Sequence, residues 1–112
     1  MDDRLKILLD SDVISRETYN SVCGIYEKFF KEGGYSKEKI DLFFTHLAMC
    51  IERVYKGEPI DHLDDSIVEE IKSNDSYEKA NQLWEEIKKE TSLDIPESEE
   101  NYLFLHLVNI LN

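Results

Sequence analysis

Apolar residues recur at steps of three and four positions through almost the whole chain, and this helical period is the strongest constraint on its fold. Such spacing places apolar side chains on one face of an α-helix. The strict alternation of a half-buried strand is absent, and the 112 residues include only two prolines and four glycines. The predicted fold class is therefore all-α. The clearest stripe consists of Ile40, Phe43, Phe44, Leu47, Ala48, Ile51 and Tyr55.

Turn and capping residues divide this pattern into segments. Gly33-Gly34 and Gly57 should each end the helix before them, and Ser36 and Ser76 can cap the helices that follow. A short first helix is predicted over residues 5–9 and a last helix over about 99–111. Between them, three further helices are marked by their apolar faces: Tyr19, Val22, Tyr26 and Phe29; Ile67, Val68 and Ile71; and Ala80, Leu83, Trp84 and Ile87. These segments predict a compact bundle of about five helices, forming a single domain over residues 1–112.

The charge of the chain limits its partners. It carries 25 acidic and 13 basic residues, a net charge of −12. Such a surface repels phosphate backbones, so we expect no direct binding to nucleic acid and an attraction for basic protein partners. No apolar run has the length needed to span a membrane, and the start, MDDRLKILLDSD, lacks the basic residues of a signal peptide. We therefore expect a cytoplasmic protein.

The sequence offers few of the groups that enzymes and metal sites use. Cys23 and Cys50 do not form a CxxC pair, and in a reducing compartment we interpret both as residues that fill helix faces. A Gly-rich phosphate loop and a nucleophile elbow are also missing. We expect no metal, no cofactor and no enzymatic activity.

His46 is the first residue that the core does not explain. At about 100° per residue, it lies more than about 90° from the centre of the apolar stripe on its own helix. Its side chain should therefore point into solvent or a second interface, with Arg53 two turns further along the same side.

The last helix carries a second histidine in a similar setting. Glu99, Tyr102, His106 and Asn109 are spaced three, four and three residues apart, and form one polar stripe on an otherwise apolar helix. A helix this apolar is expected to be mostly buried, so the stripe should line a cleft or an interface. Polar neighbours could then fix the tautomer of the imidazole.

A neutral imidazole nitrogen is a good nucleophile near neutral pH and can accept a phosphoryl group. Arg53 and Asn109 are candidate donors of hydrogen bonds to the new phosphate oxygens. Two other interpretations stay open from the residues alone. The histidines could be ordinary surface or core residues, or they could be ligands of a metal, although they lack the HExxH spacing.

Two stretches resemble the signatures of the PTS regulation domain, or PRD. HLAMCIERVYKGEPI is similar to the family's first-histidine signature, and IPESEENYLFLHLVN to its second, with Pro96, Glu99, Tyr102 and His106 at the matching positions. The stretch between them, IVEEIKSNDSYEKANQLWEEIKKETSLDIP, is similar to the family's central helices. The resemblance covers about residues 15–112.

The resemblance implies a helical regulatory domain of bacterial sugar use. In that family the histidines are phosphorylated by HPr, the phosphocarrier of the phosphoenolpyruvate phosphotransferase system, or by an EIIB component. Phosphorylation then changes dimer packing. Carried over, His46 and His106 are the candidate phosphoacceptors. Arg53, Glu99, Tyr102 and Asn109 would support them. The chain is expected to form a homodimer or to act on a separate regulator protein.

The chain departs from the family pattern in three ways. Thr45 stands where the family often has an aspartate, and a hydroxyl orients an imidazole less strongly than a carboxylate does. His62 lies in a linker where the family more often has asparagine or proline, and we assign it no role. Only one PRD is present, without an effector domain, although Met1 and the C-terminal sequence are those expected of a full chain. We therefore predict a stand-alone phosphoacceptor domain. The alternative is a PRD-derived interaction module whose histidines are not phosphorylated.

Overall fold

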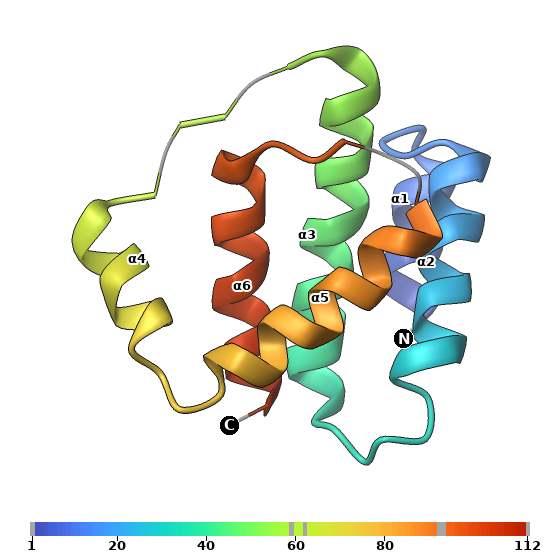
Figure 1. Ribbon diagram of the computed structural model, residues 1–112. Helices are drawn as coiled ribbons and strands as arrows, with labels where there is room; N and C mark the ends of the chain where they lie inside the picture. The colour runs from blue at the N-terminus through green and yellow to red at the C-terminus, as the bar shows by residue number, and fades with distance from the viewer. Residues whose placement is uncertain (1, 59, 62, 92–93, 112) are drawn as a thin grey trace.

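Six helices account for the periodic segments of the sequence (Figure 1). The computed structural model describes residues 2–58, 60–61, 63–91 and 94–111, with side chains from residue 4 onward. These residues contain no strand, which confirms the all-α prediction. These residues form six helices where about five were expected, and each helix corresponds to one of the segments recognised in the sequence. The helices are α1 (Asp2–Asp10), α2 (Arg16–Phe29), α3 (Lys37–Lys56), α4 (Asp65–Lys72), α5 (Tyr77–Thr91) and α6 (Glu97–Leu111).

The helix ends follow the predicted turn and capping residues with two exceptions. Ser36 stands at the N-cap of α3, but its side chain makes no capping hydrogen bond. Gly57 ends α3 in the left-handed conformation, with φ of 68°, as its position predicts. Gly33-Gly34 was expected to end α2, and this was wrong, because α2 stops at Phe29. Phe30 is almost fully buried, and its ring contacts those of Phe43 and Phe44 at centroid distances of 5.7 and 5.2 Å. Packing of this ring into the core ends the helix before the glycines are reached.

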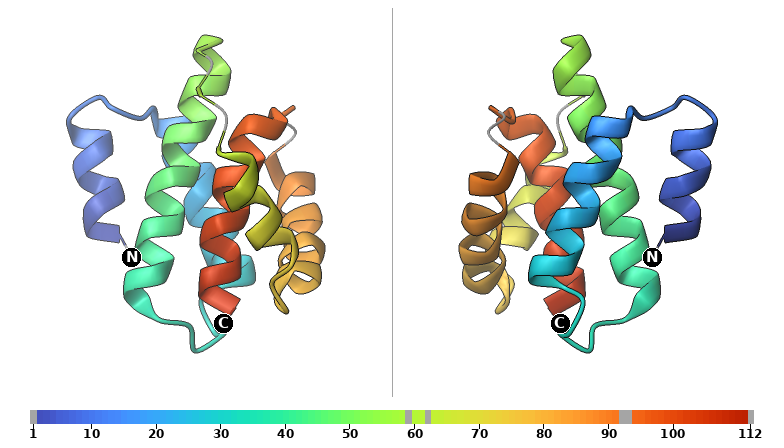
Figure 2. Two further views of the ribbon diagram at one scale, coloured as in Figure 1. Left: turned by 90° about the vertical axis from the view of Figure 1, so that its left-hand side faces the viewer. Right: turned by 90° about the vertical axis from the view of Figure 1, so that its right-hand side faces the viewer.

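The core lies around α3. This helix packs against α1 and α2 on one side and α6 on the other, while α5 crosses in front in the view of Figure 1 and contacts α2 and α6 (Figures 1 and 2). Six of the seven residues of the predicted α3 stripe are buried, Tyr55 being the exception. Trp84 of α5 is also buried, and its indole nitrogen donates a hydrogen bond of 2.5 Å to Glu100 of α6.

Two residues expected to face inward are exposed. Tyr55 is 54% exposed because the last turns of α3 extend beyond the neighbouring helices (Figure 2). Ile67 is 37% exposed because α4 lies at the edge of the bundle and packs on α6 through Ile71. In both cases the periodicity placed the residue on the apolar face of its helix, but no neighbouring helix covers that turn.

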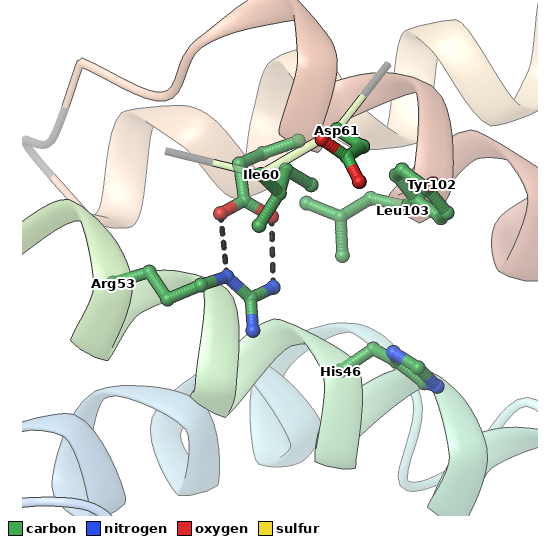
Figure 3. A pocket seen from close by; sticks show the side chains of 7 residues that line it. His46, Arg53, Ile60, Asp61, Tyr102 and Leu103 are labelled. Atoms are coloured by element: carbon green, nitrogen blue, oxygen red, sulfur yellow. Dashed lines mark hydrogen bonds and ion pairs between the residues drawn. The ribbon is translucent and has the colours of Figure 1, made fainter. Parts of the chain in front are cut away.

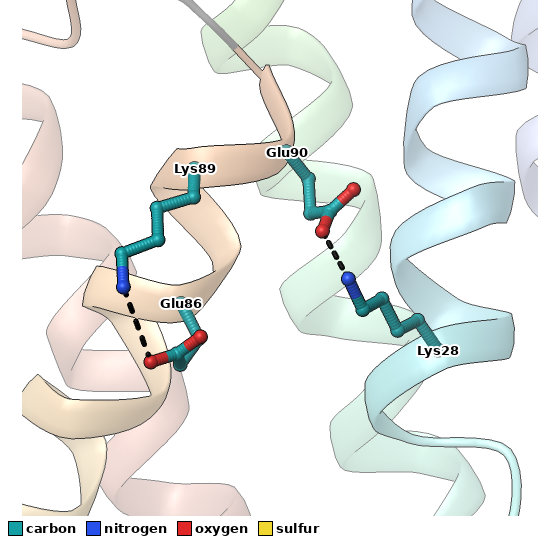
Figure 4. Close-up of polar contacts among 4 residues, drawn as sticks. All are labelled: Lys28, Glu86, Lys89 and Glu90. Atoms are coloured by element: carbon teal, nitrogen blue, oxygen red, sulfur yellow. Dashed lines mark hydrogen bonds and ion pairs between the residues drawn. The ribbon is translucent and has the colours of Figure 1, made fainter.

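Surface ion pairs join the outer helices. Lys28 of α2 pairs with Glu90 of α5, and Lys89 lies 3.4 Å from Glu86 on α5 itself (Figure 4). All four side chains are well exposed, so each pair contributes about 1 kcal/mol or less. Within the described residues, no helix combines the length and the apolar character that crossing a membrane requires.

Candidate functional site

The site lies along the seam where α3 and α6 run antiparallel (Figures 1 and 2). Three contacts follow one another along this seam: Arg53 with Glu99, His46 with His106, and Lys39 with Asn109. From the first contact to the second, both helices advance by seven residues in opposite directions, which is about two turns. The two polar stripes predicted from the sequence therefore face each other.

The two histidines stack. Their ring centroids are 4.4 Å apart and the planes are inclined by 24°. His46 is exposed, whereas His106 is half-buried. No hydrogen bond to either imidazole is found among the described residues, so hydrogen bonds do not fix the orientation of either ring. Ring nitrogens therefore remain available to an incoming group.

Both imidazoles are neutral at pH 7. Burial, followed by the positive charge of Arg53, lowers the pKa of His46 below its usual value. Burial, followed by the charge of His46, lowers the pKa of His106 to about 4. Both effects disfavour the protonated form, because a cation loses hydration on burial and repels a second cation nearby. Neutral rings keep a lone pair on one nitrogen, which a nucleophile needs.

Arg53 and Glu99 form a bidentate ion pair two turns from the histidines (Figure 3). Arg53 Nε lies 2.8 Å from Glu99 Oε2, and Nη2 lies 2.9 Å from Oε1. The Glu99 side chain is almost fully buried, whereas the arginine remains 26% exposed. Both residues bind each other rather than an imidazole. Arg53 Nη1 has no partner among the described residues, so it could still donate to an added anion.

An open hollow of about 490 Å³ connects His46 to this ion pair. Figure 3 shows Arg53 and His46 on its α3 wall, with Ile60 and Asp61 of the α3–α4 connection and Tyr102 and Leu103 of α6 opposite. One imidazole and one guanidinium thus share a solvent-accessible space. Asp61 places a carboxylate in the same space, which opposes the binding of a free anion.

Of the other two supporting residues, one lines this hollow and the other lies away from it. Tyr102 is half-buried and lines it, as noted above. Asn109 is exposed and lies beyond His106, where its backbone carbonyl accepts a hydrogen bond of 3.0 Å from Lys39 Nζ. The seam therefore brings Arg53, Glu99 and Tyr102 to the His46 side, and Asn109 to the His106 side.

Thr45 does not take the place of the family's aspartate. Its hydroxyl donates to the backbone carbonyl of Asp41, 2.7 Å away, on its own helix. His62 lies outside the described residues. Cys50 is buried, and burial together with the Glu99 carboxylate raises the pKa of its thiol to about 12, which keeps it unreactive. No cluster of three or more potential metal ligands occurs in the described part of the chain.

Sequence reasoning missed two kinds of residue at this site. Glu52 accepts hydrogen bonds from Thr18 Oγ1 at 2.6 Å and from the backbone N–H of Ser15 at 2.7 Å. It therefore ties α3 to the start of α2, just as its neighbour Arg53 ties α3 to α6. Leu42 and Leu105 are exposed beside the histidines. Leu42 could have been found, because it lies four residues before His46, off the core stripe.

The comparisons with known proteins agree with this architecture. The family described as PRD domain matches residues 18–110, which include α3 to α5 and nearly all of α2 and α6. The chain is also similar to an Escherichia coli (strain K12) protein described as uncharacterized protein YhfY, with 25% identity over 112 residues, 98% of this chain and 93% of that protein. No solved structure matches significantly. The family match spans most of the chain and both histidines, and the chain therefore belongs to the PRD domain family.

Proposed function

We propose that this chain is a regulatory phosphoacceptor domain of the bacterial phosphoenolpyruvate sugar phosphotransferase system. HPr or an EIIB component would donate the phosphoryl group, and His46 or His106 would accept it. The observation that carries the proposal is the stacked pair of neutral imidazoles beside an arginine-lined hollow. Family membership supports the same assignment. The phosphotransferase system operates in the cytoplasm, and we place the chain there.

The chemistry requires little of the domain itself. A neutral ring nitrogen attacks the phosphorus of a donor phosphohistidine or phosphocysteine, the bond from phosphorus to the donor breaks, and the donor side chain leaves with the electron pair. Arg53 Nη1 would donate a hydrogen bond to a phosphate on His46, because both residues line the hollow. The ion pair with Glu99 holds the guanidinium in place.

Stacking limits the domain to one phosphoryl group at a time. A phosphate carries close to two negative charges at pH 7. Two such groups on stacked rings whose centroids lie 4.4 Å apart would repel each other even in water. Phosphate on one ring would also favour the protonated form of the other. The pair would therefore behave as one switch rather than two.

We further propose that the signal is transmitted by association, with a second copy of the chain or with a separate regulator protein. Met49 and Leu105 are exposed beside the histidines and would be covered by such a partner. A new dianion at that face changes the affinity for whatever covers it. We regard the chain as a single domain over residues 1–112, without catalytic turnover of its own.

The direct test is intact-mass analysis after incubation with phosphoenolpyruvate, enzyme I and HPr, with candidate EIIB proteins in parallel. Wild type, His46→Ala and His106→Ala are compared. We expect an acid-labile gain of one phosphoryl group that disappears in one variant, which identifies the acceptor. His62→Ala is the matched control and should retain the gain. If no donor phosphorylates the wild type, the proposal fails.

A second candidate function rests on a specific observation. The Thr45 hydroxyl is bound to Asp41, and no described side chain orients either imidazole by a hydrogen bond. A phosphoacceptor histidine normally has such a partner, so these histidines could belong to a PRD-derived interaction module that is never phosphorylated. Thr45→Asp separates the two functions. If phosphorylation appears only in this variant, the native chain is the silent module.

A further inference from the structure

A second hollow opens on the opposite side of the histidine pair from Arg53. It has a volume of about 380 Å³ and lies between α3, α4 and α6. Its wall includes His106 and is largely aliphatic, with contributions from Leu42, Ile67, Ile71 and Leu105. We call it the aliphatic groove.

The mouth of the aliphatic groove exposes large apolar side chains from three different helices. Leu42 of α3 is 43% exposed, Ile67 of α4 is 37% exposed and Leu105 of α6 is 39% exposed. Isolated exposed leucines are common on protein surfaces, but a group that converges on one concave opening marks a site for a partner. A groove between helices accepts the apolar face of an amphipathic helix, whose anchors recur every three or four residues.

The charge around the groove is strongly negative on its α4 side. Residues 58–78 contain eight acidic residues and one lysine, a net charge of −7 within a chain whose total is −12. Glu70 lines the groove itself, and Asp65 and Glu69 are exposed on the same helix. Lys39 is bound to the carbonyl of Asn109 at the end of α6, and Lys72 is exposed in the last turn of α4.

We propose that the aliphatic groove binds an amphipathic helix with lysine and arginine residues along its flank, supplied by a separate regulator protein. The apolar face would cover Leu42, Ile67 and Leu105, and the basic flank would lie against α4. A second copy of this chain fits less well, because it would bring a further net charge of −12 against the acidic side of the groove. The interaction itself requires no phosphate, but it rests on the association with a separate regulator proposed above, because Leu105 belongs to both surfaces.

The test uses the full unphosphorylated chain and two synthetic helical peptides. Both carry the same pattern of leucines, one with lysine and one with glutamate at every polar position. Methyl NMR spectra at low salt should show saturable shifts at Leu42, Ile67 and Leu105 with the lysine peptide alone. Leu105→Asp should weaken binding by at least about tenfold. Ile7→Asp is the matched control, because Ile7 is 64% exposed on α1. This variant should bind the lysine peptide as tightly as the wild type does.

A charge exchange adds a second measurement that does not depend on the apolar variants. Glu70→Lys should weaken binding of the lysine peptide, and added salt should weaken it in the wild type as well. Equal binding of both peptides, equal loss in Leu105→Asp and Ile7→Asp, or shifts outside the groove would each overturn the proposal. A wild-type dimer in sedimentation that Leu105→Asp dissociates would overturn it in favour of a second copy. None of these results affects the phosphorylation test.

Discussion

The ion pair between Arg53 and Glu99 allows the strongest test of how α6 is held against α3. Arg53→Met removes the guanidinium, keeps most of the aliphatic stem and leaves the Glu99 carboxylate without its partner. That carboxylate is only 3% exposed and loses two hydrogen bonds of 2.8 and 2.9 Å. Breaking a buried pair by removing one partner costs about 3–5 kcal/mol. Because Arg53 is 26% exposed and some water reaches the site, we expect about 3 kcal/mol.

The assay is urea denaturation followed by the fluorescence of Trp84, the single tryptophan, which is buried in the core. A loss of about 3 kcal/mol corresponds to a fall in Tm of about 10–15 °C for a domain of this size. Because a domain has about 5–15 kcal/mol of stability, the variant should still fold. The double variant Arg53→Met, Glu99→Gln should recover much of the loss, since it leaves no unpaired buried charge.

Lys28→Met is the matched control, because Lys28 and Glu90 form a cation–carboxylate pair that is well exposed (Figure 4). Its loss should be about 1 kcal/mol or less. If Arg53→Met costs no more than Lys28→Met, or if the double variant is the least stable of the set, the ion pair does not hold the seam and the reasoning is refuted.

Three further outcomes are expected. In NMR titrations His106 should remain neutral until the pH approaches about 4. Because the unfolded chain binds this proton near pH 6.5, stability should fall as the pH drops from about 6.5 to 4, by up to about 2 kcal/mol after solvent screening. His106→Asn should reduce that slope without abolishing it, because the pKa of His46 is also lowered, and a His106 pKa above 6 would contradict the cause we assign. Phosphorylation should stop at one group per chain even with excess donor, and a doubly phosphorylated species in the mass spectrum would show that the stacked rings separate. Gly57→Ala should destabilise the fold by about 1 kcal/mol, because the φ of Gly57 is 68°. Gly24→Ala should stabilise the fold by about 0.5–1 kcal/mol, because Gly24 lies within α2 with open space around it. Thermal melts in which both variants shift Tm in the same direction would contradict this.

Much of the fold follows from local patterns. The period of the apolar residues located the helices, and Gly57 located the end of α3. The failures have one cause. The α2 end, the exposure of Tyr55 and the exposure of Ile67 depend on which other helix lies opposite, and the period of a single helix does not contain that information.

The candidate site, like the fold, could be predicted from the sequence only within each single helix. The spacing within each helix was enough to place His46 with Arg53 on one face, and Glu99 with His106 on another, because about 3.6 residues per turn relates positions on one helix. Arg53 and Glu99 were expected to support the imidazoles, but they bind each other instead. Leu42 and Leu105 were passed over, because an apolar residue away from the core stripe gains meaning only when neighbouring helices surround it.

The sequence by itself determined that the chain forms amphipathic helices, that it is strongly acidic, and that each of two helices carries a polar stripe with a histidine. The tertiary structure decided that these stripes meet, in an antiparallel register that pairs Arg53 with Glu99 and stacks His46 on His106. It also decided that the pKa of both rings lies below its usual value, because burial and a neighbouring cation act only once the helices are packed. Register between helices is set by how the core side chains of α3 and α6 interlock, and no spacing within either helix specifies it.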